Sequence, residues 1–192
     1  MAAPRRTPRF SIVSDDCWAG AVYRHFDRPY DTPFVGLFVR SEEYLRMLGD
    51  LRAYLAEPLR FRDRLGESAG TRYPVGLLGD VEIHFLHYRH RGHADVAWSR
   101  RMERMDFDRL AVKFSAAPDG RAHDQVARFS RLPFERKVAF SKLPVPGAVH
   151  VPDWRWDNAF AETERVFDVA AWLRGRSPQR RRSARNGRST SA

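Results

Sequence analysis

The sequence predicts an α/β domain in which a mostly parallel sheet is flanked by helices. Short apolar runs typical of strands alternate along the chain with segments whose apolar residues recur at helical spacing. Strands separated in this way are usually parallel and joined by right-handed crossovers. The chain has 192 residues, of which 43% are hydrophobic, and this is enough to bury one sizeable core. We therefore expect a single domain.

The individual elements follow from the order of these patterns. Strands are expected at residues 10–14, 34–39, 81–88, 110–115 and 137–140. Ser41 can cap a helix whose apolar stripe consists of Tyr44, Leu45, Leu48, Leu51 and Leu55. Further helical stripes are expected at residues 94–105, 122–129 and 160–170. Residues 57–71 and 144–158 show neither period, and we expect them to form mobile loops.

The net charge of +10 is concentrated at the two ends of the sequence. Residues 1–9 contain three arginines, residues 174–192 contain seven, and neither segment contains an acid. These ten arginines equal the whole excess of basic over acidic residues, so the sequence between them carries no net charge. The C-terminal segment has almost nothing to bury, and the entropy cost of ordering it would be unopposed. We therefore predict a flexible basic segment at 1–9, one α/β domain at 10–173 and a disordered arginine-rich tail at 174–192.

The sequence contains no segment that predicts a membrane-spanning or secreted protein. No apolar run approaches the roughly 20 residues that cross a bilayer, and no secretory apolar segment follows the Arg5-Arg6 pair. Cys17 is the only cysteine, so no internal disulfide can form. We expect a cytoplasmic protein. The alternative is a cytoplasmic protein that also binds peripherally to a membrane.

The stretch "SDDCWAGAVY", residues 14–23, follows the first predicted strand. Ligands of parallel sheets bind beyond the carboxyl ends of the strands, which is where Asp15, Asp16 and Trp18 would lie. Either aspartate could instead accept hydrogen bonds from the N–H groups that begin the next helix. The two carboxylates disfavour a thiolate, so Cys17 is expected to be buried and inert. Asp16 is a candidate catalytic residue, and Asp15 and Trp18 are candidate substrate contacts.

The stretch "GDVEIHFLHYRHRGH" contains four histidines spaced three apart, His84, His87, His90 and His93. The alternating pattern around His84 is that of a strand, on which His84 and His87 point to opposite faces, so we do not expect a shared metal ion. His87 and Tyr88 come nearest the predicted ligand site, which makes His87 the candidate acid/base catalyst and Tyr88 a candidate substrate contact. His84, also a candidate contact, is either a hydrogen-bonded structural histidine or an acid/base group oriented by Asp80 or Glu82.

The stretch "WSRRMERM", residues 98–105, places Arg101 and Arg104 on one face of a predicted helix. Two guanidinium groups suit a phosphate or a carboxylate, because their planar forks donate several hydrogen bonds at once. The alternative is a solvated face that pairs with Asp106 or Asp108. We include both arginines as candidate substrate-binding residues.

Five stretches together carry a family resemblance: "SIVSDDCWAGAVY", "TPFVGLFVRSEEYLRML", "YPVGLLGDVEIHFLHY", "AWSRRMERMDFDRL" and "KVAF". They resemble the bacterial family known as domain of unknown function 1919, whose members are often labelled exopolysaccharide biosynthesis proteins. The resemblance spans residues 10–140. Asp15, Asp16 and Ala19 stand where the family more often has two asparagines and a glycine, and Asp31-Thr32-Pro33 replaces Ser-Pro-Thr. The resemblance implies a role in surface-polysaccharide production and assigns no catalytic residues.

These features predict an enzyme of surface or exopolysaccharide biosynthesis, a transferase that acts on a sugar phosphate or a nucleotide-sugar. In this hypothesis His87 is the general base, Arg101 and Arg104 hold the phosphate, and Asp15 or Asp16 orients a hydroxyl or a divalent cation. Hydrolysis would use similar groups. The alternative is a non-catalytic accessory protein that contacts glycan machinery, a membrane surface or nucleic acid through residues 174–192.

Overall fold

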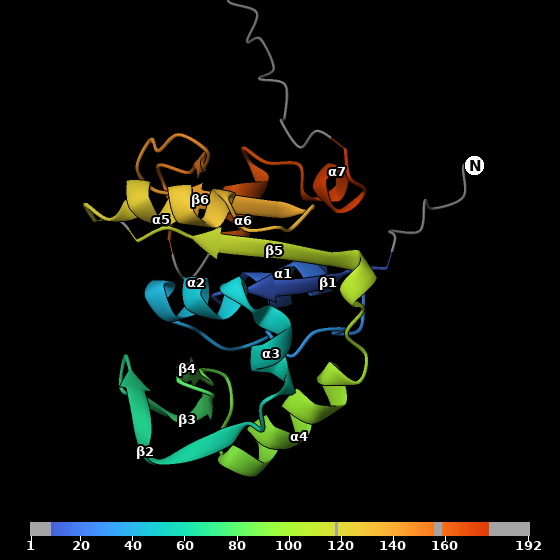
Figure 1. Ribbon diagram of the computed structural model, residues 1–192, viewed down its shortest axis with the longest axis vertical. Helices are drawn as coiled ribbons and strands as arrows, with labels where there is room; N and C mark the ends of the chain where they lie inside the picture. Colours follow the sequence, from blue (N-terminus) through green and yellow to red (C-terminus); the bar gives the residue numbers. More distant parts are fainter. Residues whose placement is uncertain (1–8, 118, 156–158, 177–192) are drawn as a thin grey trace, which may run out of the picture.

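Four parallel strands form the central sheet of this protein, whose computed structural model describes residues 9–117, 119–155 and 159–176 (Figure 1). The order across the sheet is β1, β5, β6, β7, and every neighbouring pair is parallel. The strands are β1 (Ser11–Ser14), β5 (Leu110–Ser115), β6 (Lys137–Ser141) and β7 (Val149–His150). The predicted fold class, an α/β architecture with a parallel sheet flanked by helices, is confirmed.

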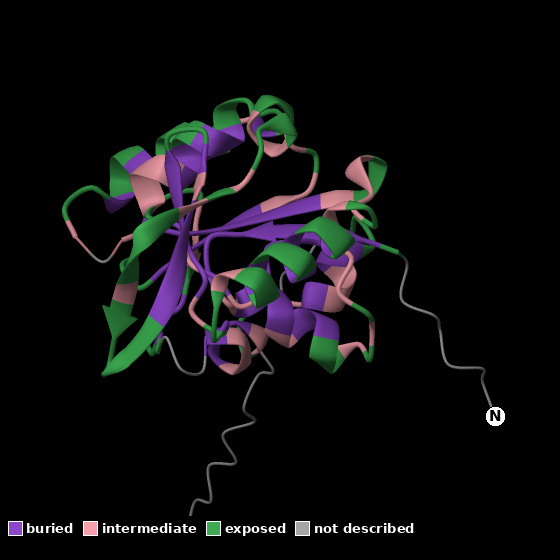
Figure 2. Ribbon diagram, turned by 90° about the horizontal axis from the view of Figure 1, so that it is seen from below, coloured by how far each residue is buried: buried purple, intermediate pink, exposed green. Residues whose placement is uncertain are grey.

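Helices cover both faces of this sheet because alternate strand residues point to opposite sides. Val112 and Phe114 of β5 belong to one apolar core, whereas Ala111 belongs to the other. The first core is covered by α2 (Ser41–Gly49), α3 (Leu51–Ala56), α4 (Arg91–Met102) and α5 (Ala122–Ser130). The second is covered by α1 (Trp18–His25), α6 (Ala159–Glu164) and α7 (Val169–Leu173). Figure 2 shows the buried residues concentrated on the central strands and on the inward faces of the helices.

A second, antiparallel sheet packs against the first core. Its strands are β2 (Arg60–Ser68), β3 (Thr71–Leu78) and β4 (Val81–His84), with β3 in the middle. In Figure 1 this sheet lies below the parallel sheet and beside α4. A 3-10 turn, η1 (Phe107–Arg109), then leads into β5. The whole second sheet is therefore inserted between β1 and β5, which are neighbours in the parallel sheet.

Three predicted segments differ from the observed fold. Residues 34–39 form no strand, because only Phe38 pairs, in an isolated bridge with His84, and Gly36 has a φ of 73° that interrupts an extended backbone. The run is apolar because it is buried between the two sheets. The strand expected at 81–88 ends at His84 and belongs to the antiparallel sheet. Residues 57–71, expected to be a loop, form most of the β2–β3 hairpin, and β2 is so exposed that no alternation marks it.

The predicted helices are confirmed, but their ends differ and two of the predicted stripes are each divided into two helices. The stripe that follows Ser41 is divided into α2 and α3 at Asp50, whose carboxylate accepts a hydrogen bond from the Ala53 N–H. Arg40, and not Ser41, is the N-cap of α2. The stripe at 160–170 is divided into α6 and α7, because the Asp168 carboxylate accepts a hydrogen bond from the Ala171 N–H and starts a new helix there. The segment expected as a loop at 144–158 contains the short strand β7. None of the helices in the described residues has the length and apolar character of a membrane-spanning helix.

The predicted flexible ends lie largely outside the described residues. Of the segment at 1–9, only Arg9 is described, and of the tail at 174–192, only 174–176 are described. These last residues continue from α7, since the Arg176 N–H donates to the Ala171 carbonyl oxygen at 2.9 Å. Flexibility at 1–9 and disorder at 174–192 therefore stay predictions.

Candidate functional site

A buried polar cluster lies at the carboxyl ends of β1 and β5. Lys113 is fully buried, and its Nζ atom lies 2.5 Å from Asp16 Oδ2 and 3.1 Å from Asp15 Oδ1. Ser115 adds a hydrogen bond from its N–H to Asp15 at 3.0 Å and one from its hydroxyl to Asp16 at 3.1 Å. The Ser14 hydroxyl donates to the other oxygen of Asp16 at 3.1 Å. One ammonium group and two carboxylates therefore share a site that is almost completely buried.

The two carboxylates of this cluster have different proton affinities. Burial raises the pKa of Asp15 to about 7, because Lys113 only partly offsets the loss of solvation and Asp16 adds a second negative charge. Burial acts on Asp16 in the same sense, but the charge of Lys113 and the hydrogen bonds from Lys113, Trp18 and Ser115 hold its pKa below the usual value. Asp16 is therefore the ionised partner of Lys113, and Asp15 is the carboxyl group that titrates near neutral pH.

The start of α1 is attached to this cluster through Asp16. Its Oδ1 atom accepts a hydrogen bond from the Trp18 N–H at 3.0 Å, as the capping interpretation of this motif predicted. The Trp18 indole N–H in turn donates to the Thr163 hydroxyl of α6 at 2.8 Å. The Cys17 thiol donates to the Leu37 carbonyl oxygen at 3.7 Å, and burial raises the pKa of Cys17 to about 12. The thiol is therefore protonated at neutral pH, but Cys17 is only partly buried and lines a cavity, so the expected full burial is wrong and its inertness stays a prediction.

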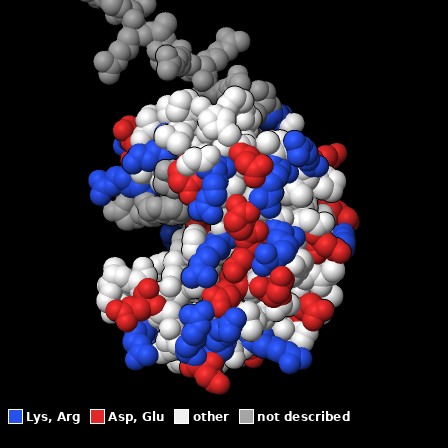
Figure 3. All heavy atoms as spheres, turned by 60° about the vertical axis from the view of Figure 1, so that its left-hand side comes forward, with Lys and Arg blue, Asp and Glu red and all other residues white. Residues whose placement is uncertain are grey.

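A cavity of about 870 Å³ opens above this helix start. Its walls come from the start of α1, the β2–β3 turn, the loop after β4 and the start of α6, and its aromatic lining consists of Trp18, Phe38, Tyr73 and Phe160. Figure 3 shows a notch between the upper and lower parts of the molecule at the left of the view. The β2–β3 turn belongs to the second sheet, and α6 belongs to the helices that cover the parallel sheet. This cavity therefore lies between the second sheet and those helices.

A smaller cavity of about 250 Å³ adjoins the larger one. Both cavities are lined by Cys17, Arg24 and His87. The smaller cavity is otherwise lined by Gly20, Tyr30, Val35, Gly36, Tyr88, His93 and Arg101. Two guanidinium groups, those of Arg24 and Arg101, therefore line one small space, and neither makes an ion pair within the described part of the chain. The site combines an aromatic compartment with a cationic one, and His87 lies where they meet.

The guanidinium group of Arg101 is held in place by neighbouring residues, and its Nε donor has no hydrogen-bond partner. Its Nη1 atom donates to the Tyr88 hydroxyl and to the Val35 carbonyl oxygen, and the Tyr88 hydroxyl donates to the same carbonyl at 2.7 Å. The Tyr30 ring lies under the guanidinium at 4.9 Å. The Nε atom is buried without a hydrogen-bond partner. A buried cation with an unpaired donor beside a cavity is a favourable position for an anionic ligand group.

The structure brings together most of the residues that the sequence singled out. Asp16, Trp18 and His87 line the larger cavity, and His87, Tyr88 and Arg101 line the smaller one. The remaining candidates, Asp15, His84 and Arg104, line neither cavity.

Each of these three has a different surrounding from the expected one. Asp15 lies beneath the helix start, bonded to Lys113. Arg104 donates to the Tyr30 carbonyl oxygen at 2.7 Å and lies 3.8 Å from Asp31, so it fixes a loop, and its pairing with Asp106 or Asp108 is absent. His84 is packed against Phe38 and Tyr73.

His84 shows neither of the two predicted arrangements in full. Both of its ring nitrogens lack a hydrogen-bond partner, so it is not a hydrogen-bonded structural histidine. Glu82 lies 3.8 Å from its Nε2 atom but is already engaged by Arg62 and Arg64, while Asp80 pairs with Arg46 at the surface. Burial lowers the pKa of His84.

Two residues of the candidate site, Lys113 and Arg24, were not predicted from the sequence. A lysine within the apolar run "LAVKFS" of a buried strand signals a buried ion pair, because an unpaired charge there would be too costly. Its partners lie almost a hundred residues away and cannot be named from spacing. Arg24 directly follows the stretch "SDDCWAGAVY", but no pattern in the sequence marks it, and only the turn of α1 places it at both cavities.

The aspartates do not fit a divalent cation. Their oxygens already face the Lys113 ammonium group, which occupies the position that a cation would take. Within the described ranges, no cluster of three or more histidine, cysteine, aspartate or glutamate side chains has the arrangement of a metal site. We therefore derive no step that involves a metal ion.

Comparisons with known proteins agree with the resemblance seen in the motifs. The chain is 30% identical over 165 residues to a protein of Haemophilus influenzae (strain ATCC 51907 / DSM 11121 / KW20 / Rd) described as an "Uncharacterized protein". The aligned region covers 84% of this chain and 76% of that protein. The family model described as "Domain of unknown function (DUF1919)" matches residues 5–172, which include the parallel sheet, the inserted second sheet and both cavities. The chain is thus a member of the DUF1919 family.

Proposed function

We propose that this protein is an enzyme of surface or exopolysaccharide biosynthesis, a transferase that acts on a sugar phosphate or a nucleotide-sugar in the cytoplasm. The observation that carries the proposal is the pair of joined cavities, one aromatic and one cationic, which share Cys17, Arg24 and His87. A glycosyl phosphate has the same two parts, a ring with apolar C–H faces and an anionic group. The label often given to proteins of this family supports the choice of pathway.

In this proposal the smaller cavity holds the phosphate. Arg101 is fixed by Tyr88 and Val35, so its remaining donors are oriented before the ligand arrives. Arg24, which is exposed, supplies the second guanidinium group. Together they replace the predicted pair of Arg101 and Arg104. They also stabilise the negative charge that develops on a departing phosphate.

His87 is the proposed general base at the junction of the cavities. It takes the proton from an acceptor hydroxyl, the acceptor oxygen bonds to the anomeric carbon, and the bond from that carbon to the phosphate oxygen breaks with its electron pair remaining on the phosphate. Asp16 is a positioning residue, because each of its oxygens already accepts two hydrogen bonds. Asp15 and Lys113 act with it, since they hold the turn that precedes α1.

The test combines ligand binding with turnover in the full chain. Sugar phosphates and nucleotide-sugars, each with and without Mg²⁺, are screened for a rise in melting temperature, because a ligand that binds only the folded state stabilises it. The Arg101→Gln variant should lose the shift, and Arg24→Gln, at an exposed position, should weaken it even if Arg101→Gln fails to fold. The Arg100→Gln variant, at an exposed position on α4, is the matched control.

His87→Ala should keep the ligand-induced shift and lose turnover by about 10² to 10⁴-fold, the usual contribution of a general base. His123→Ala, at an exposed position on α5, is its control. Turnover of His87→Ala at the wild-type rate would exclude His87 as the base. A protein that melts cooperatively and shifts with none of the compounds would contradict the substrate class.

A second candidate function is that of a non-catalytic accessory protein that contacts glycan machinery, a membrane surface or nucleic acid. The observation that favours it is the concentration of arginines at both ends of the sequence. The same screen separates the two candidates, because an accessory protein would show no turnover with any donor.

A further inference from the structure

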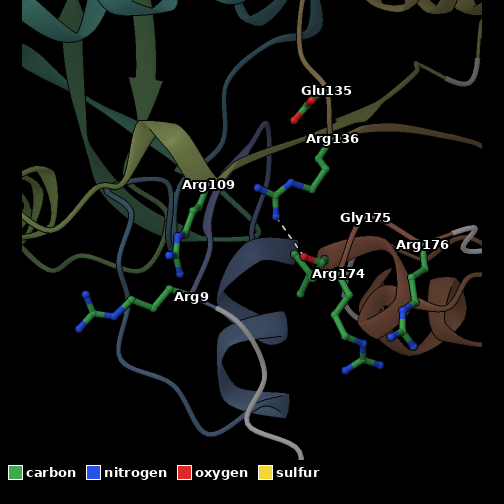
Figure 4. A pocket seen from close by; sticks show the side chains of 8 residues that line it. Arg9, Arg109, Glu135, Arg136, Arg174, Gly175 and Arg176 are labelled. Carbon is green, nitrogen blue, oxygen red and sulfur yellow. Dashed lines mark hydrogen bonds between the residues drawn. The ribbon is translucent and has the colours of Figure 1, made fainter.

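A third cavity, of about 840 Å³, lies at the amino ends of the parallel strands. Five arginines and one acid line it, together with Leu173 and Gly175: Arg9, Arg109, Arg136, Arg174, Arg176 and Glu135 (Figure 4). Figure 4 shows that these side chains come from separate segments, which are the chain just before β1, the turns before β5 and β6, and the end of α7. The fold therefore collects basic residues that are far apart in the sequence.

Most of this positive charge is not neutralised by the protein. Arg136 donates to the Leu173 carbonyl oxygen at 3.0 Å, which fixes α7 beside the sheet but involves no acid. Arg109 lies 3.6 Å from Asp106. Within residues 9–117, 119–155 and 159–176, no ion pair involves Arg9, Arg174 or Arg176. The pocket therefore keeps a net positive charge.

The charge also continues along the chain on both sides of the pocket. Arg9 and Arg176 are the first and last described arginines, and both line the pocket. The sequence before Arg9 contains two more arginines, the sequence after Arg176 contains five, and neither contains an acid. Both basic segments are therefore joined to the folded protein at this one place.

We propose that this arginine pocket binds the phosphate backbone of a nucleic acid strand. Guanidinium forks match phosphate oxygens, and arginine is the residue typical of nucleic-acid contacts. The binding is independent of base sequence, because the pocket contains no aromatic side chain on which a base could stack.

A nucleic acid fits the pocket better than a bilayer does. Interfacial binding to a membrane is strengthened by apolar side chains that insert among the lipids. The large exposed apolar residues of the described chain are Leu65, Val96, Leu143 and Val166, and none lines the pocket. Leu173 lines it but is fully buried. The five arginines of the pocket come from separate segments, so they can contact several phosphates of one strand.

The pocket lies at the edge of the sheet opposite the candidate transferase site. Arg9, Arg109 and Arg136 precede β1, β5 and β6, whereas Asp16 and Ser115 lie where β1 and β5 end. The proposal is therefore independent of the proposed function, because a polymer bound at one edge leaves the cavities at the other edge open.

The test measures binding of the full chain to a fluorescent 20-nucleotide single strand between 50 and 200 mM NaCl. Each phosphate contact contributes about 0.7 to the slope of log K against log salt for a single strand, so Arg174→Gln/Arg176→Gln should reduce the slope by about 1.4. Arg60→Gln/Arg100→Gln removes the same charge from exposed positions elsewhere and should leave the slope unchanged. Inorganic polyphosphate should compete for the wild-type protein.

Several outcomes would overturn the proposal. An equal change of slope in both double variants would show that net charge, and not this pocket, determines binding. A change in Arg180→Gln/Arg181→Gln/Arg182→Gln with none in Arg174→Gln/Arg176→Gln would assign the contact to residues 177–192 alone. Binding to phosphatidylglycerol vesicles without binding to the strand would identify the partner as a membrane. Absence of binding to the strand at 50 mM NaCl would refute the proposal directly.

Discussion

The Lys113 ammonium group lies 2.5 Å from the Asp16 carboxylate although both side chains are almost completely buried. This ion pair joins β5 to the turn between β1 and α1. Asp16 also receives the first N–H of α1, so the position of the helix depends on the charge of Lys113. The lower wall of the larger cavity is thereby connected to the centre of the parallel sheet.

Replacement of Lys113 by methionine should strongly destabilise the protein. The variant leaves Asp16 buried without its cation, and breaking a buried ion pair from one side costs about 3–5 kcal/mol. Urea unfolding at pH 7 measures the free energy of unfolding. Lys142→Met, at an exposed position, should change it by less than about 0.5 kcal/mol. Equal stability of the two variants would mean that the ion pair contributes little.

The contribution of Asp15 to the stability of the protein should decrease between about pH 4 and pH 7. Its pKa is near 3.8 in the unfolded chain and about 7 in the folded protein, so over this interval Asp15 binds more protons in the folded state than in the unfolded state. The Asp15 contribution to the free energy of unfolding must therefore fall as pH rises, whereas His84, whose pKa is lowered by burial, contributes in the opposite sense. Asp16 also acts in the opposite sense to Asp15 because its pKa is lowered in the folded protein. It stabilises the folded state at neutral pH, and this stabilisation is lost as pH falls through its folded pKa.

Asp15→Asn should flatten this decrease, because asparagine stays neutral at every pH. Urea unfolding at pH 4.5, 6 and 8 makes the comparison. Asp95→Asn, at an exposed position on α4, should keep the wild-type profile. If Asp15→Asn and the wild type were to show parallel profiles, the titrating group would not be Asp15.

Gly36→Ala should disturb both stability and the candidate site. Gly36 has a φ of 73°, and an added Cβ would lie 3.2 Å from the Cβ of His87 and 3.3 Å from the Tyr88 ring. The left-handed backbone alone costs a side chain about 1–2 kcal/mol. Thermal unfolding and the ligand screen should both report a loss. Gly49→Ala, with open space around it at the end of α2, should be neutral or stabilising.

The hydrogen bond from the Trp18 indole N–H to the Thr163 hydroxyl should couple the stability of α1 to that of α6. Thr163→Val leaves the buried indole N–H without its acceptor and should cost about 1–3 kcal/mol. In a double-mutant cycle, Thr163→Val should lower the free energy of unfolding less in the Trp18→Phe variant than in the wild type. Strict additivity of the two losses, measured by urea unfolding, would show that the hydrogen bond does not couple the helices.

The parts of the fold that could be predicted from sequence are those marked by a local period. The strands β1, β5 and β6 are short apolar runs, and α2, α4 and α5 carry clear apolar stripes, so both kinds of element were located within a few residues. The β2–β3 hairpin was missed because Arg60–Ser68 is exposed along most of its length. Residues 34–39 were misassigned because an irregular segment that is mostly buried is as apolar as a strand.

The candidate site was predicted most directly where chain order positions a residue. Asp16 and Trp18 follow β1 directly, and this is sufficient to place them beside a cavity. Arg104 was grouped with Arg101 by helical spacing, but α4 ends at Met102, so the two side chains separate beyond that point. Lys113 and Arg24 depend on contacts between distant segments, which no local pattern contains.

The tip of the β2–β3 hairpin forms part of one wall of the larger cavity. Ser68, Ala69 and Thr71 line the cavity, while most of β2 is exposed and belongs to neither core. Insertions and deletions at such a tip are tolerated far better than changes inside a core. The width of the cavity can therefore diverge among relatives through hairpin length, while the buried ion pair and His87 stay as they are. For the proposed transferase, we therefore expect the length of this hairpin to alter which substrates fit the cavity.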